Sequence, residues 1–220
     1  MAVTSRQLIV PGALLLSGFL DLEEQRALAA QCQGLVDGPV PGYVPIVRGG
    51  GRMHVRMLCL GRHWNGRSYR YETTRSDYDD LPAPPLPDNF RELASRAAVA
   101  AGMTINADLC ILNYYDREGR MGLHQDKDES AESIAAGIPV VSISIGDTAR
   151  FLFGGTKRRD PVATLMLESG DAFVFGGPAR LCYHGVTRTL PGTAPPELEL
   201  SGRFNLTLRE YGPAEFTTQN

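Results

Sequence analysis

The segment LHQDKDES at residues 123–130 contains several side chains that can bind metal ions. His124, Asp126 and Asp128 follow one another at intervals of two residues. A single His-x-Asp triplet is most often an accidental pair on a solvated surface, so this segment alone is weak support for a metal site. A further histidine, His184, lies far downstream in the segment CYHGV. Together with Asp126, the two histidines form a candidate metal site with two nitrogen ligands and one carboxylate.

Two histidines and one aspartate are the ligand set of the facial triad in non-haem Fe(II) oxygenases. Neutral imidazoles supply nitrogen ligands, the carboxylate supplies negative charge, and the opposite face of the octahedron stays open for a co-substrate and O₂. The chain has only four histidines, and His124 and His184 both lie beside segments that are expected to be strands. The alternative for each is a core histidine whose hydrogen bonds are satisfied within the protein.

The segment RFNLTLRE at residues 203–210 is typical of a strand with one polar and one apolar face. Side chains alternate across a strand, so its polar residues share one face. These residues are Arg203, Asn205, Thr207 and Arg209. If this face lines a barrel interior, the two guanidinium groups need an anion, and a dicarboxylate such as 2-oxoglutarate would supply it. Asn113 and Tyr115 in CILNYYD share a strand face in the same way. The alternative is that the polar face is simply exposed to solvent.

The second half of the chain predicts a β fold. From residue 107 onward, seven short β-branched or aromatic runs are separated by turn sequences such as DREG, ESGD and GGP. The runs are ADLCILNYY, IPVVSISIG, ARFLFGG, VATLMLES, DAFVFGG, ARLCYHGV and RFNLTLRE. Seven strands without intervening helices indicate a sandwich, a jelly roll or a barrel.

Two helices are expected to accompany this β region. Asp21 and Glu24 form a capping-box variant ahead of LEEQRALAAQCQGL, a helix that Gly34 or Gly38 would end. The segment DNFRELASRAAVAAG has an apolar stripe at helical spacing, with its first residue as N-cap and its last as C-cap. The N-terminal MAVTSRQLIVPGALLLSGFL is interpreted as an entry strand and turn instead of a signal peptide, because Pro-Gly interrupts its apolar run.

Residues 40–85 fit neither the helices nor the β region. This segment begins and ends in proline-rich sequence and holds six arginines but no acidic residue between positions 48 and 71. Trp64, Tyr69 and Tyr71 lie among these arginines. One interpretation is a solvated basic hairpin whose aromatic side chains pack on the core. The other is a flap that handles nucleotides, with arginines for phosphates and aromatic rings for base stacking.

The composition limits the class of protein. The length of 220 residues suits one domain, and 24 Gly with 15 Pro favour a turn-rich β fold. A net charge of −3 excludes a global basic field, so any binding of nucleic acid must be local. Four scattered cysteines with apolar neighbours predict buried, reduced thiols in a cytoplasmic protein. No apolar run is long enough to span a membrane.

The combination of NYY, LHQDKDE, YHG and RFNLTLR resembles the AlkB family of Fe(II)/2-oxoglutarate-dependent dioxygenases, in its bacterial DNA-repair dealkylase branch. VSISIG and FGGTKRRDP match as well; the resemblance is close from about residue 85 to 211 and looser at 40–80. It implies a mainly β fold with flanking helices (α+β) in a single domain over residues 1–220. The implied parts are a double-stranded β-helix, or jelly-roll, catalytic core at 105–211 and a nucleotide-recognition flap at 40–85.

The resemblance also implies roles for single residues. It makes His124, Asp126 and His184 the ligands of Fe(II). It makes Asn113, Tyr115, Arg203, Asn205 and Arg209 the contacts of 2-oxoglutarate. For the substrate it implies contacts from Met57, Trp64, Tyr69, Tyr71, Asp128 and Arg158. Trp64 and His124 would stack on opposite faces of the target base, and Asp128 would face the alkylated base.

The implied activity is oxidative demethylation of bases such as N1-methyladenine and N3-methylcytosine, in single-stranded or duplex DNA or in RNA. 2-Oxoglutarate and O₂ would be co-substrates, with decarboxylation to succinate and release of the hydroxylated methyl group as formaldehyde. This reaction is direct-reversal DNA repair. An anionic Asp128 would favour these cationic bases over neutral, undamaged ones. A cytoplasmic monomer without membrane contact is expected.

Two other functions are compatible with parts of the sequence. A 2-oxoglutarate-dependent oxygenase acting on a protein, a lipid or a small molecule would carry the same iron and co-substrate motifs, but the basic aromatic segment argues against it. A non-catalytic jelly-roll binding module would keep only a remnant of the metal site. The intact ligand set and both arginines argue against that module.

Overall fold

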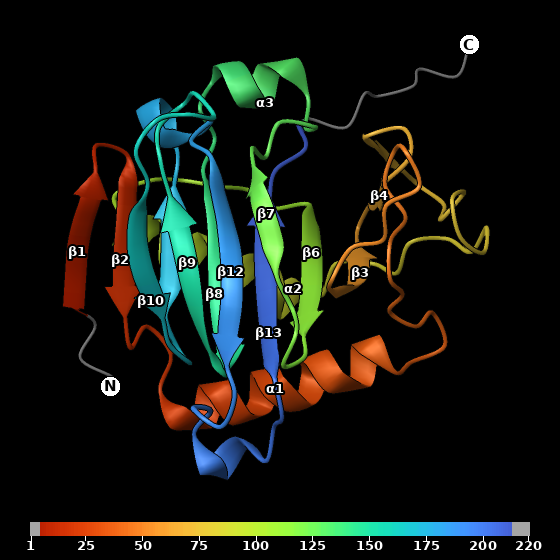
Figure 1. Ribbon diagram of the computed structural model, residues 1–220, viewed down its shortest axis with the longest axis horizontal. Coiled ribbons are helices and arrows are strands. Elements are labelled where there is room, and N and C mark those ends of the chain that lie inside the picture. Colours follow the sequence, from red (N-terminus) through yellow and green to blue (C-terminus); the bar gives the residue numbers. More distant parts are fainter. Residues whose placement is uncertain (1–4, 213–220) are drawn as a thin grey trace.

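The computed structural model describes residues 5–212, which form two large antiparallel β-sheets and a small hairpin (Figure 1). The strands are β1 (Ser5–Val10), β2 (Ala13–Ser17), β3 (Arg56–Leu60), β4 (His63–Asn65), β5 (Arg70–Glu72), β6 (Leu109–Tyr115), β7 (Met121–His124), β8 (Val140–Gly146), β9 (Thr148–Phe153), β10 (Ala163–Leu167), β11 (Ala172–Phe175), β12 (His184–Leu190) and β13 (Arg203–Arg209). The helices are α1 (Leu22–Val36), α2 (Asp88–Ala100) and α3 (Ala131–Ala135), and the 3₁₀ helices are η1 (Gly177–Ala179) and η2 (Pro196–Leu198).

The two large sheets pack face to face. The seven-stranded sheet has the order β1-β2-β11-β8-β13-β6-β3, and the four-stranded sheet has the order β10-β9-β12-β7. Aromatic rings fill the space between them at one end: Phe151 and Phe153 of β9 lie 5.3 and 5.0 Å from Phe173 of β11, measured between ring centroids. Two antiparallel sheets joined through their inner faces give the predicted mainly β, jelly-roll architecture.

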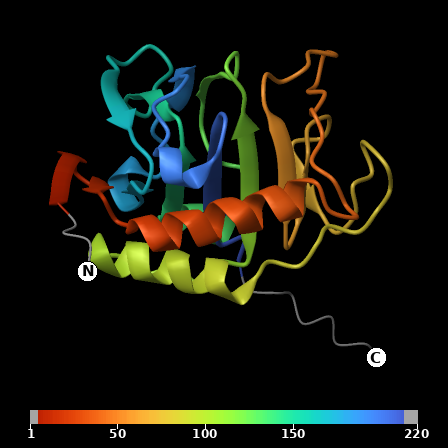
Figure 2. The ribbon, with the colours of Figure 1, turned by 90° about the horizontal axis from the view of Figure 1, so that it is seen from below.

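Helices α1 and α2 lie side by side across the outer face of the seven-stranded sheet (Figure 2). The predicted apolar stripe of α2 is buried there, with Phe90, Ala94 and Ala97 fully covered. Leu206 of β13 belongs to the same apolar cluster. The apolar face of β13 therefore packs toward the helices, and its polar face is left to point toward the four-stranded sheet.

The start of α1 matches the sequence prediction, and its C-cap, Asp37, lies one residue before the predicted Gly38. Asp21 and Glu24 form both hydrogen bonds of the predicted capping box. The last helical residue is Val36, so the helix passes through Gly34 and ends before Gly38. Neither glycine has to end the helix, because main-chain hydrogen bonds close its last turn.

The ends of α2 are each shifted by one residue from the prediction. Pro87 is the N-cap and offers no side-chain hydrogen bond, so the prediction of Asp88 as N-cap is wrong. Asp88 is instead the first helical residue, where its charge faces the positive end of the helix dipole. Ala101 is the C-cap, and Gly102 follows it with φ of 76°. Glycine is favoured at that next position because it adopts the left-handed conformation without strain.

The β region differs from the predicted runs in two places. The run ARLCYHGV is not a single strand, because its first residues lie in or after η1 and β12 begins only at His184. Pro178 lies within η1 and has no main-chain N–H to donate to a ladder. The second difference is β7, a short strand that ends at His124 and was not among the predicted runs.

Residues 40–85 divide between the core and an outer hairpin. Strand β3 is the edge strand of the seven-stranded sheet and pairs with β6, so part of this segment belongs to the core. Strands β4 and β5 pair only with each other. The interior of this outer part is polar and aromatic. The guanidinium of Arg75, a residue 1% exposed, lies 5.0 Å from the ring centroids of both Tyr43 and Tyr78.

The cysteines behave as predicted. Cys32, Cys59, Cys110 and Cys182 are all buried and free. Burial raises the pKa of the Cys59 thiol to about 11, which keeps it protonated and unreactive at neutral pH. Within residues 5–212, no helix combines the length and the apolar character needed to cross a membrane.

Candidate metal centre and substrate cavity

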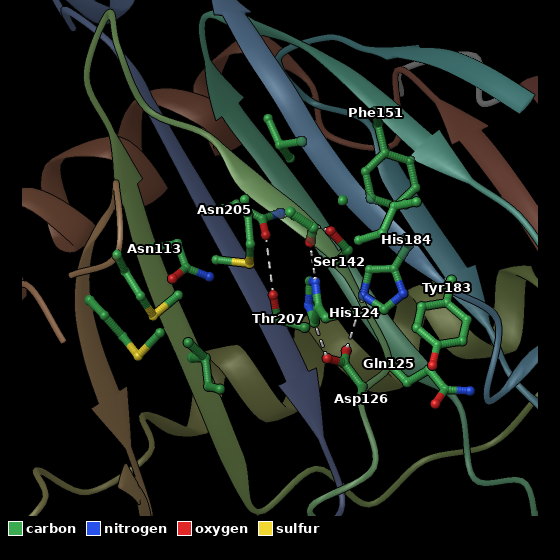
Figure 3. A pocket seen from close by; sticks show the side chains of 18 of the residues that line it. Asn113, His124, Gln125, Asp126, Ser142, Phe151, Tyr183, His184, Asn205 and Thr207 are labelled. Atoms are coloured by element: carbon green, nitrogen blue, oxygen red, sulfur yellow. Dashed lines mark hydrogen bonds and ion pairs between the residues drawn. The ribbon is translucent and has the colours of Figure 1, made fainter. Parts of the chain in front are cut away.

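The three predicted metal ligands converge between the two sheets (Figure 3). His124 ends β7 and His184 begins β12, and the two are direct cross-strand partners with ring centroids 4.4 Å apart. Asp126 follows two residues after β7 and is buried. Its carboxylate oxygens lie 3.5 Å from Nε2 of His124 and 3.6 Å from Nε2 of His184. One ligand atom from each residue lies within 4.8 Å of the other two, so a single metal ion can bind all three.

Hydrogen bonds determine which nitrogen of each histidine faces the centre. Nδ1 of His124 lies 2.9 Å from the carbonyl oxygen of Gly122, and Nδ1 of His184 lies 3.0 Å from that of Cys182. A carbonyl oxygen only accepts, so each Nδ1 carries the proton and each Nε2 keeps its lone pair. Metal-binding histidines commonly donate their second ring nitrogen in this way. The donor set therefore fits Fe(II).

A buried arginine balances the charge of the centre. Burial alone would raise the pKa of Asp126, but the Arg209 guanidinium 2.8 Å away, together with His184, holds this pKa well below its usual range. Burial lowers the pKa of His184. For His124 burial acts in the same direction, but Asp126 outweighs it and raises the pKa. A charged carboxylate and neutral imidazoles are the forms that bind a metal.

A cavity of about 420 Å³ opens beside these ligands. All four polar side chains of β13 line it, and Asn113 and Tyr115 of β6 line it as well. Strands β13 and β6 are neighbours, and Asn205 pairs directly with Asn113. The polar face of β13 therefore points into the cavity and not into solvent, as Asn205 and Thr207 show in Figure 3.

Arg203 is a buried cation with no carboxylate partner within residues 5–212. It is 1% exposed. Its guanidinium donates to Ser144 Oγ at 2.7 Å and to the carbonyl oxygens of Asp147 and Leu167 at 3.4 and 3.3 Å, while its Nε has no partner. Burial lowers its pKa to about 10. A buried cation in this state needs an anion, and a carboxylate of a small diacid matches its fork of donors.

Arg209, at the other end of β13, is already surrounded by oxygens. It lies 2.8 Å from Asp126 and 3.3 Å from Glu129, and it donates to the hydroxyl of Tyr71 at 2.5 Å. Burial opposes its charge, but these three neighbours together raise the pKa of Arg209. Arg209 therefore orients the metal-binding carboxylate, and its predicted contact with 2-oxoglutarate stays a prediction.

The amide and phenol groups predicted to contact the co-substrate differ in how far other side chains already satisfy their hydrogen bonds. Oδ1 of Asn113 is buried without a partner in the described part of the chain. The Tyr115 hydroxyl donates only to the sulfur of Met121 at 4.0 Å, a weak acceptor. Asn205 instead donates to Ser142 Oγ at 2.7 Å. Asn113 and Tyr115 thus keep the greater capacity to bind a ligand in the cavity.

The mouth of the cavity is formed by predicted substrate contacts. Nε1 of Trp64 donates to Asp128 at 2.8 Å, and the ring of Tyr69 stands edge-on to Trp64 with centroids 5.4 Å apart. Arg158 donates to a main-chain carbonyl of β7 at 2.9 Å, and Met57 forms part of the cavity wall. Burial raises the pKa of Asp128. An aromatic ring and a carboxylate thus stand at the entrance.

The two tyrosines of the 40–85 segment occupy different places. Tyr69 is 40% exposed and lines the mouth. Tyr71 is 7% exposed, and its hydroxyl donates to Glu129 at 3.4 Å in addition to accepting from Arg209. This geometry favours Tyr69 as the contact for a bound strand. The predicted substrate role of Tyr71 stays a prediction.

Sequence reasoning missed two buried charged residues of the site, Glu129 and Arg180. Arg180 follows η1, four residues before His184. It donates to the carbonyl oxygens of Asp126 and of Ile138, the latter at 2.8 Å, and to Glu129 at 2.9 Å. Arg180 therefore joins the two segments that carry metal ligands. Glu129 was visible within LHQDKDES, whereas nothing in ARLCYHGV distinguishes Arg180 from a surface residue.

Other cavity residues were also missed, because their types carry no sequence signal of their own. They are Met121 and four residues labelled in Figure 3, namely Gln125, Ser142, Phe151 and Tyr183. Apolar and uncharged side chains of this kind are found equally in ordinary cores. Only the register of the strands places them around one cavity.

Comparison with known proteins agrees with this arrangement. A family model described as the 2OG-Fe(II) oxygenase superfamily matches residues 12–209. An alpha-ketoglutarate-dependent dioxygenase AlkB homolog of Caulobacter vibrioides is 40% identical over 205 residues, which cover 91% of this chain and 88% of that protein. The solved structure of OsALKBH1 superposes with a TM-score of 0.87 at 38% identity and covers 94% of this chain and 100% of that chain.

A plant protein is similar over a longer alignment but only in part of its own length. The DNA N(6)-methyladenine demethylase ALKBH1C of Arabidopsis thaliana is 40% identical over 228 residues. The match covers 94% of this chain and 50% of the plant protein. The chain thus spans about half the length of the plant relatives it matches.

Proposed function

The chain belongs to the AlkB family within the 2OG-Fe(II) oxygenase superfamily, and from this premise we propose that it demethylates nucleic-acid bases oxidatively. Fe(II) is the cofactor, and 2-oxoglutarate and O₂ are the co-substrates. The observation that carries the proposal is that one cavity joins His124, Asp126 and His184 to Trp64 and Asp128 at its mouth. An oxygenase of small molecules or proteins would share the metal ligands but has no need of this mouth.

In this proposal the chain's own residues hold the iron and the co-substrate. His124 and His184 bind Fe(II) through Nε2, and Asp126 binds it through its carboxylate. Bound Fe(II), with O₂ and 2-oxoglutarate, supplies the oxidation of an N-linked methyl group. Arg203 takes one carboxylate of 2-oxoglutarate, because its guanidinium is buried without a carboxylate partner in residues 5–212 and its Nε has no hydrogen-bond partner there. The further proposed contacts of the co-substrate are Asn113, Tyr115, Asn205 and Arg209.

The proposed target is a cationic methylated base, such as N1-methyladenine or N3-methylcytosine. Trp64 stacks on the flipped-out base, opposite His124, and Asp128 faces its ring. Burial makes the charge of Asp128 costly without a cationic partner, so a cationic base gains more from this carboxylate than a neutral base does. The methyl group also blocks base pairing, which lowers the cost of flipping the base out. Direct-reversal repair of DNA follows from this choice of target.

A second candidate is demethylation of N6-methyladenine, because the similar plant protein is named for that activity. N6-methyladenine is neutral, so Asp128 would act on it only as a hydrogen-bond acceptor. The two candidates use the same iron and co-substrate residues. They differ in how much the charge of Asp128 contributes.

The remaining parts of the proposal concern the substrate strand and the setting. The strand is single-stranded or duplex DNA, or RNA, and Tyr69, Tyr71 and Arg158 contact it, while Met57 closes the pocket. We assign nucleotide recognition to residues 40–85 and catalysis to the jelly-roll core at 105–211 of one domain. The protein acts as a monomer in the cytoplasm.

Mass spectrometry of a mixed set of modified oligonucleotides tests the proposal. The protein is incubated with Fe(II), 2-oxoglutarate and O₂, and loss of one methyl group is followed for each of N1-methyladenine, N3-methylcytosine and N6-methyladenine. We expect the two cationic bases to be demethylated fastest. Turnover of N6-methyladenine alone would select the second candidate. Succinate formation with no change in any oligonucleotide would point to another substrate class.

A further inference from the structure

The outer face of the four-stranded sheet carries an exposed pair of arginines. Arg150 of β9 and Arg188 of β12 are direct cross-strand partners, and both are exposed. Within residues 5–212, neither side chain makes an ion pair. The hydroxyl of Thr187 donates to the main-chain oxygen of Arg150 and leaves its guanidinium free. Like charges directly opposite one another destabilise a sheet. The pair therefore costs stability unless an anion binds it.

A β-bulge turns Arg188 outward. Along β12, His184 and Val186 both line the cavity, so simple alternation would point Arg188 inward as well. The register against β9 shifts between Val186 and Arg188, which makes Thr187 an extra residue. Arg188 consequently pairs with Arg150 on the outer face. Bulges often redirect a side chain in this way near functional sites.

A third arginine extends the pair across the sheet. Arg120 directly precedes β7, and because Met121 pairs with Val186, Arg120 lies beside the bulge of β12. It is exposed, and its guanidinium lies 3.0 Å from Nε2 of His54. Arg120, Arg188 and Arg150 thus form a row over three neighbouring strands, which we call the arginine face. The chain as a whole has a net charge of −3, so this row is a local concentration of positive charge.

The arginine face lies on the outer side of the strands whose inner side carries the metal ligands. Arg188 lies four residues after His184 on β12, a distance of about 13 Å at roughly 3.3 Å per residue. Gly185 between them is buried, and a Cβ there would lie 2.7 Å from the carbonyl oxygen of Met121, so β7 packs closely against β12 at this point. In the described part of the chain, no helix covers this side of β7, β12 and β9 (Figure 1). A polyanion that leaves the mouth of the cavity would pass over β7, the edge strand of this sheet, to reach the arginines.

We propose that the arginine face binds the phosphate backbone of the nucleic acid on one side of the target base. This inference rests on the proposed function. Each strand of a duplex rises about 3.4 Å per nucleotide, so about 13 Å corresponds to roughly four nucleotides from the flipped base. Contacts of this kind position the strand without reading its sequence. They would raise affinity for long substrates and leave the choice of methylated base unchanged.

Binding of a length series tests the inference. Fluorescence anisotropy is measured on single-stranded oligonucleotides of about 3, 9 and 21 nucleotides with one central methylated base, over a range of salt concentrations. The double variant Arg150→Gln/Arg188→Gln is compared with Arg26→Gln/Arg96→Gln, which removes the same charge from the helices on the opposite side. We expect Arg150→Gln/Arg188→Gln to bind the shortest oligonucleotide with the same affinity as wild type. On the longer ones we expect a roughly fivefold to twentyfold loss and a salt slope shallower by about 1.4, two single-strand phosphate contacts.

The outcomes separate this inference from the proposed function. Turnover of the shortest oligonucleotide by wild type and by the double variant tests the function and shows that the variant is folded. If wild type turns over the shortest oligonucleotide but both double variants bind long oligonucleotides as tightly as wild type does, only the arginine face is refuted. If wild type turns over no oligonucleotide yet binds long ones through Arg150 and Arg188, the proposed reaction is refuted and the binding face stands. Equal losses in both double variants would reduce the effect to net charge and refute the arginine face.

Discussion

At the scale of single residues, the metal centre is prepared by groups that do not themselves bind the metal. Main-chain carbonyls fix the proton of each histidine on Nδ1, and Arg209 keeps Asp126 charged. The ligand types and their spacing identified His124, Asp126 and His184 as candidates from sequence. Their supporting partners were found only in part: Arg209 was expected in the cavity, but as a contact of 2-oxoglutarate, and Arg180 resembles a surface arginine until the strands are paired.

The first prediction concerns the carboxylate ligand. We expect Asp126→Ala to lower turnover by about 100-fold or more, because it removes one of three ligands, while loss of a supporting partner alone already costs 10–100-fold in such sites. His184→Ala should behave alike. Metal binding is measured by titration with Fe(II) or Mn(II) under anaerobic conditions, and circular dichroism checks the fold. Near-normal metal affinity in either variant would contradict the assignment.

The second prediction concerns Asp128, which lies at the mouth beside Trp64. Asp128→Asn keeps the size and an acceptor oxygen but removes the charge. We expect kcat/KM to fall about tenfold on N1-methyladenine and N3-methylcytosine, equivalent to roughly 1.4 kcal/mol, and to change little on neutral N1-methylguanine or N3-methylthymine.

Trp64→Ala is the matched comparison for Asp128. Stacking accepts any base, so this variant should weaken all four modified bases alike, by about 1–3 kcal/mol. The readout is kcat/KM on four oligonucleotides that carry one modified base each. Equal losses on cationic and neutral bases for Asp128→Asn would remove Asp128 from substrate recognition.

At the scale of elements, the site depends on which way each strand face points. The alternation in RFNLTLR predicted a polar and an apolar face for β13, and burial under α2 decides which face meets the cavity. Strand β7 and helix η1 were not predicted, because four residues with a glycine carry no clear period and a Pro-containing turn looks like a loop. Strand β7 is held by its pairing with β12, and Arg180, which follows η1, makes three tertiary hydrogen bonds.

The third prediction concerns this arginine, which links η1 to the metal-binding segment. Arg180→Met removes its bonds to the main chain of Asp126 and leaves Glu129 with Arg209 and Tyr71 only. Breaking a buried ion pair costs about 3–5 kcal/mol, so thermal stability should fall. Metal affinity should fall about 10–100-fold, the range for supporting residues.

The double variant Arg180→Met/Glu129→Gln separates stability from positioning. Removing the second charge should restore part of the melting temperature, because Glu129 then no longer carries a buried charge that has lost one of its partners. Metal affinity should stay low, since the bond to the Asp126 carbonyl is still missing. Recovery of both quantities together would show that Arg180 has a purely structural role.

At the scale of the whole molecule, two sheets enclose a cavity that contains the buried guanidinium of Arg203, which has no carboxylate partner within residues 5–212. The mainly β fold and the flanking helices were predictable from periodicity and turn chemistry, but the pairing of strands across the two sheets was not. That pairing places Arg203 at the closed interior, where burial lowers its pKa to about 10. At neutral pH Arg203 is still charged, and its buried guanidinium has only neutral hydrogen-bond acceptors, which offset part of the cost of burying this charge.

The last prediction follows from that cost. 2-Oxoglutarate with a bound divalent metal should stabilise wild type by about 2.7 kcal/mol at a hundredfold excess over Kd. For a domain of this size the shift in Tm is then roughly 5–10 °C. The folded pKa of Arg203 is depressed to about 10, so the unfolded chain binds more protons above that pH, and ligand-free stability should rise with pH there through this group. Arg203→Gln should melt within about 3 °C of ligand-free wild type and lose the shift from 2-oxoglutarate while keeping the shift from metal alone. Arg203→Lys should recover only part of the shift in Tm from 2-oxoglutarate, because an ammonium cannot reproduce the guanidinium fork. An unchanged 2-oxoglutarate shift in Arg203→Gln, measured by scanning calorimetry without O₂, would show that the anion binds elsewhere.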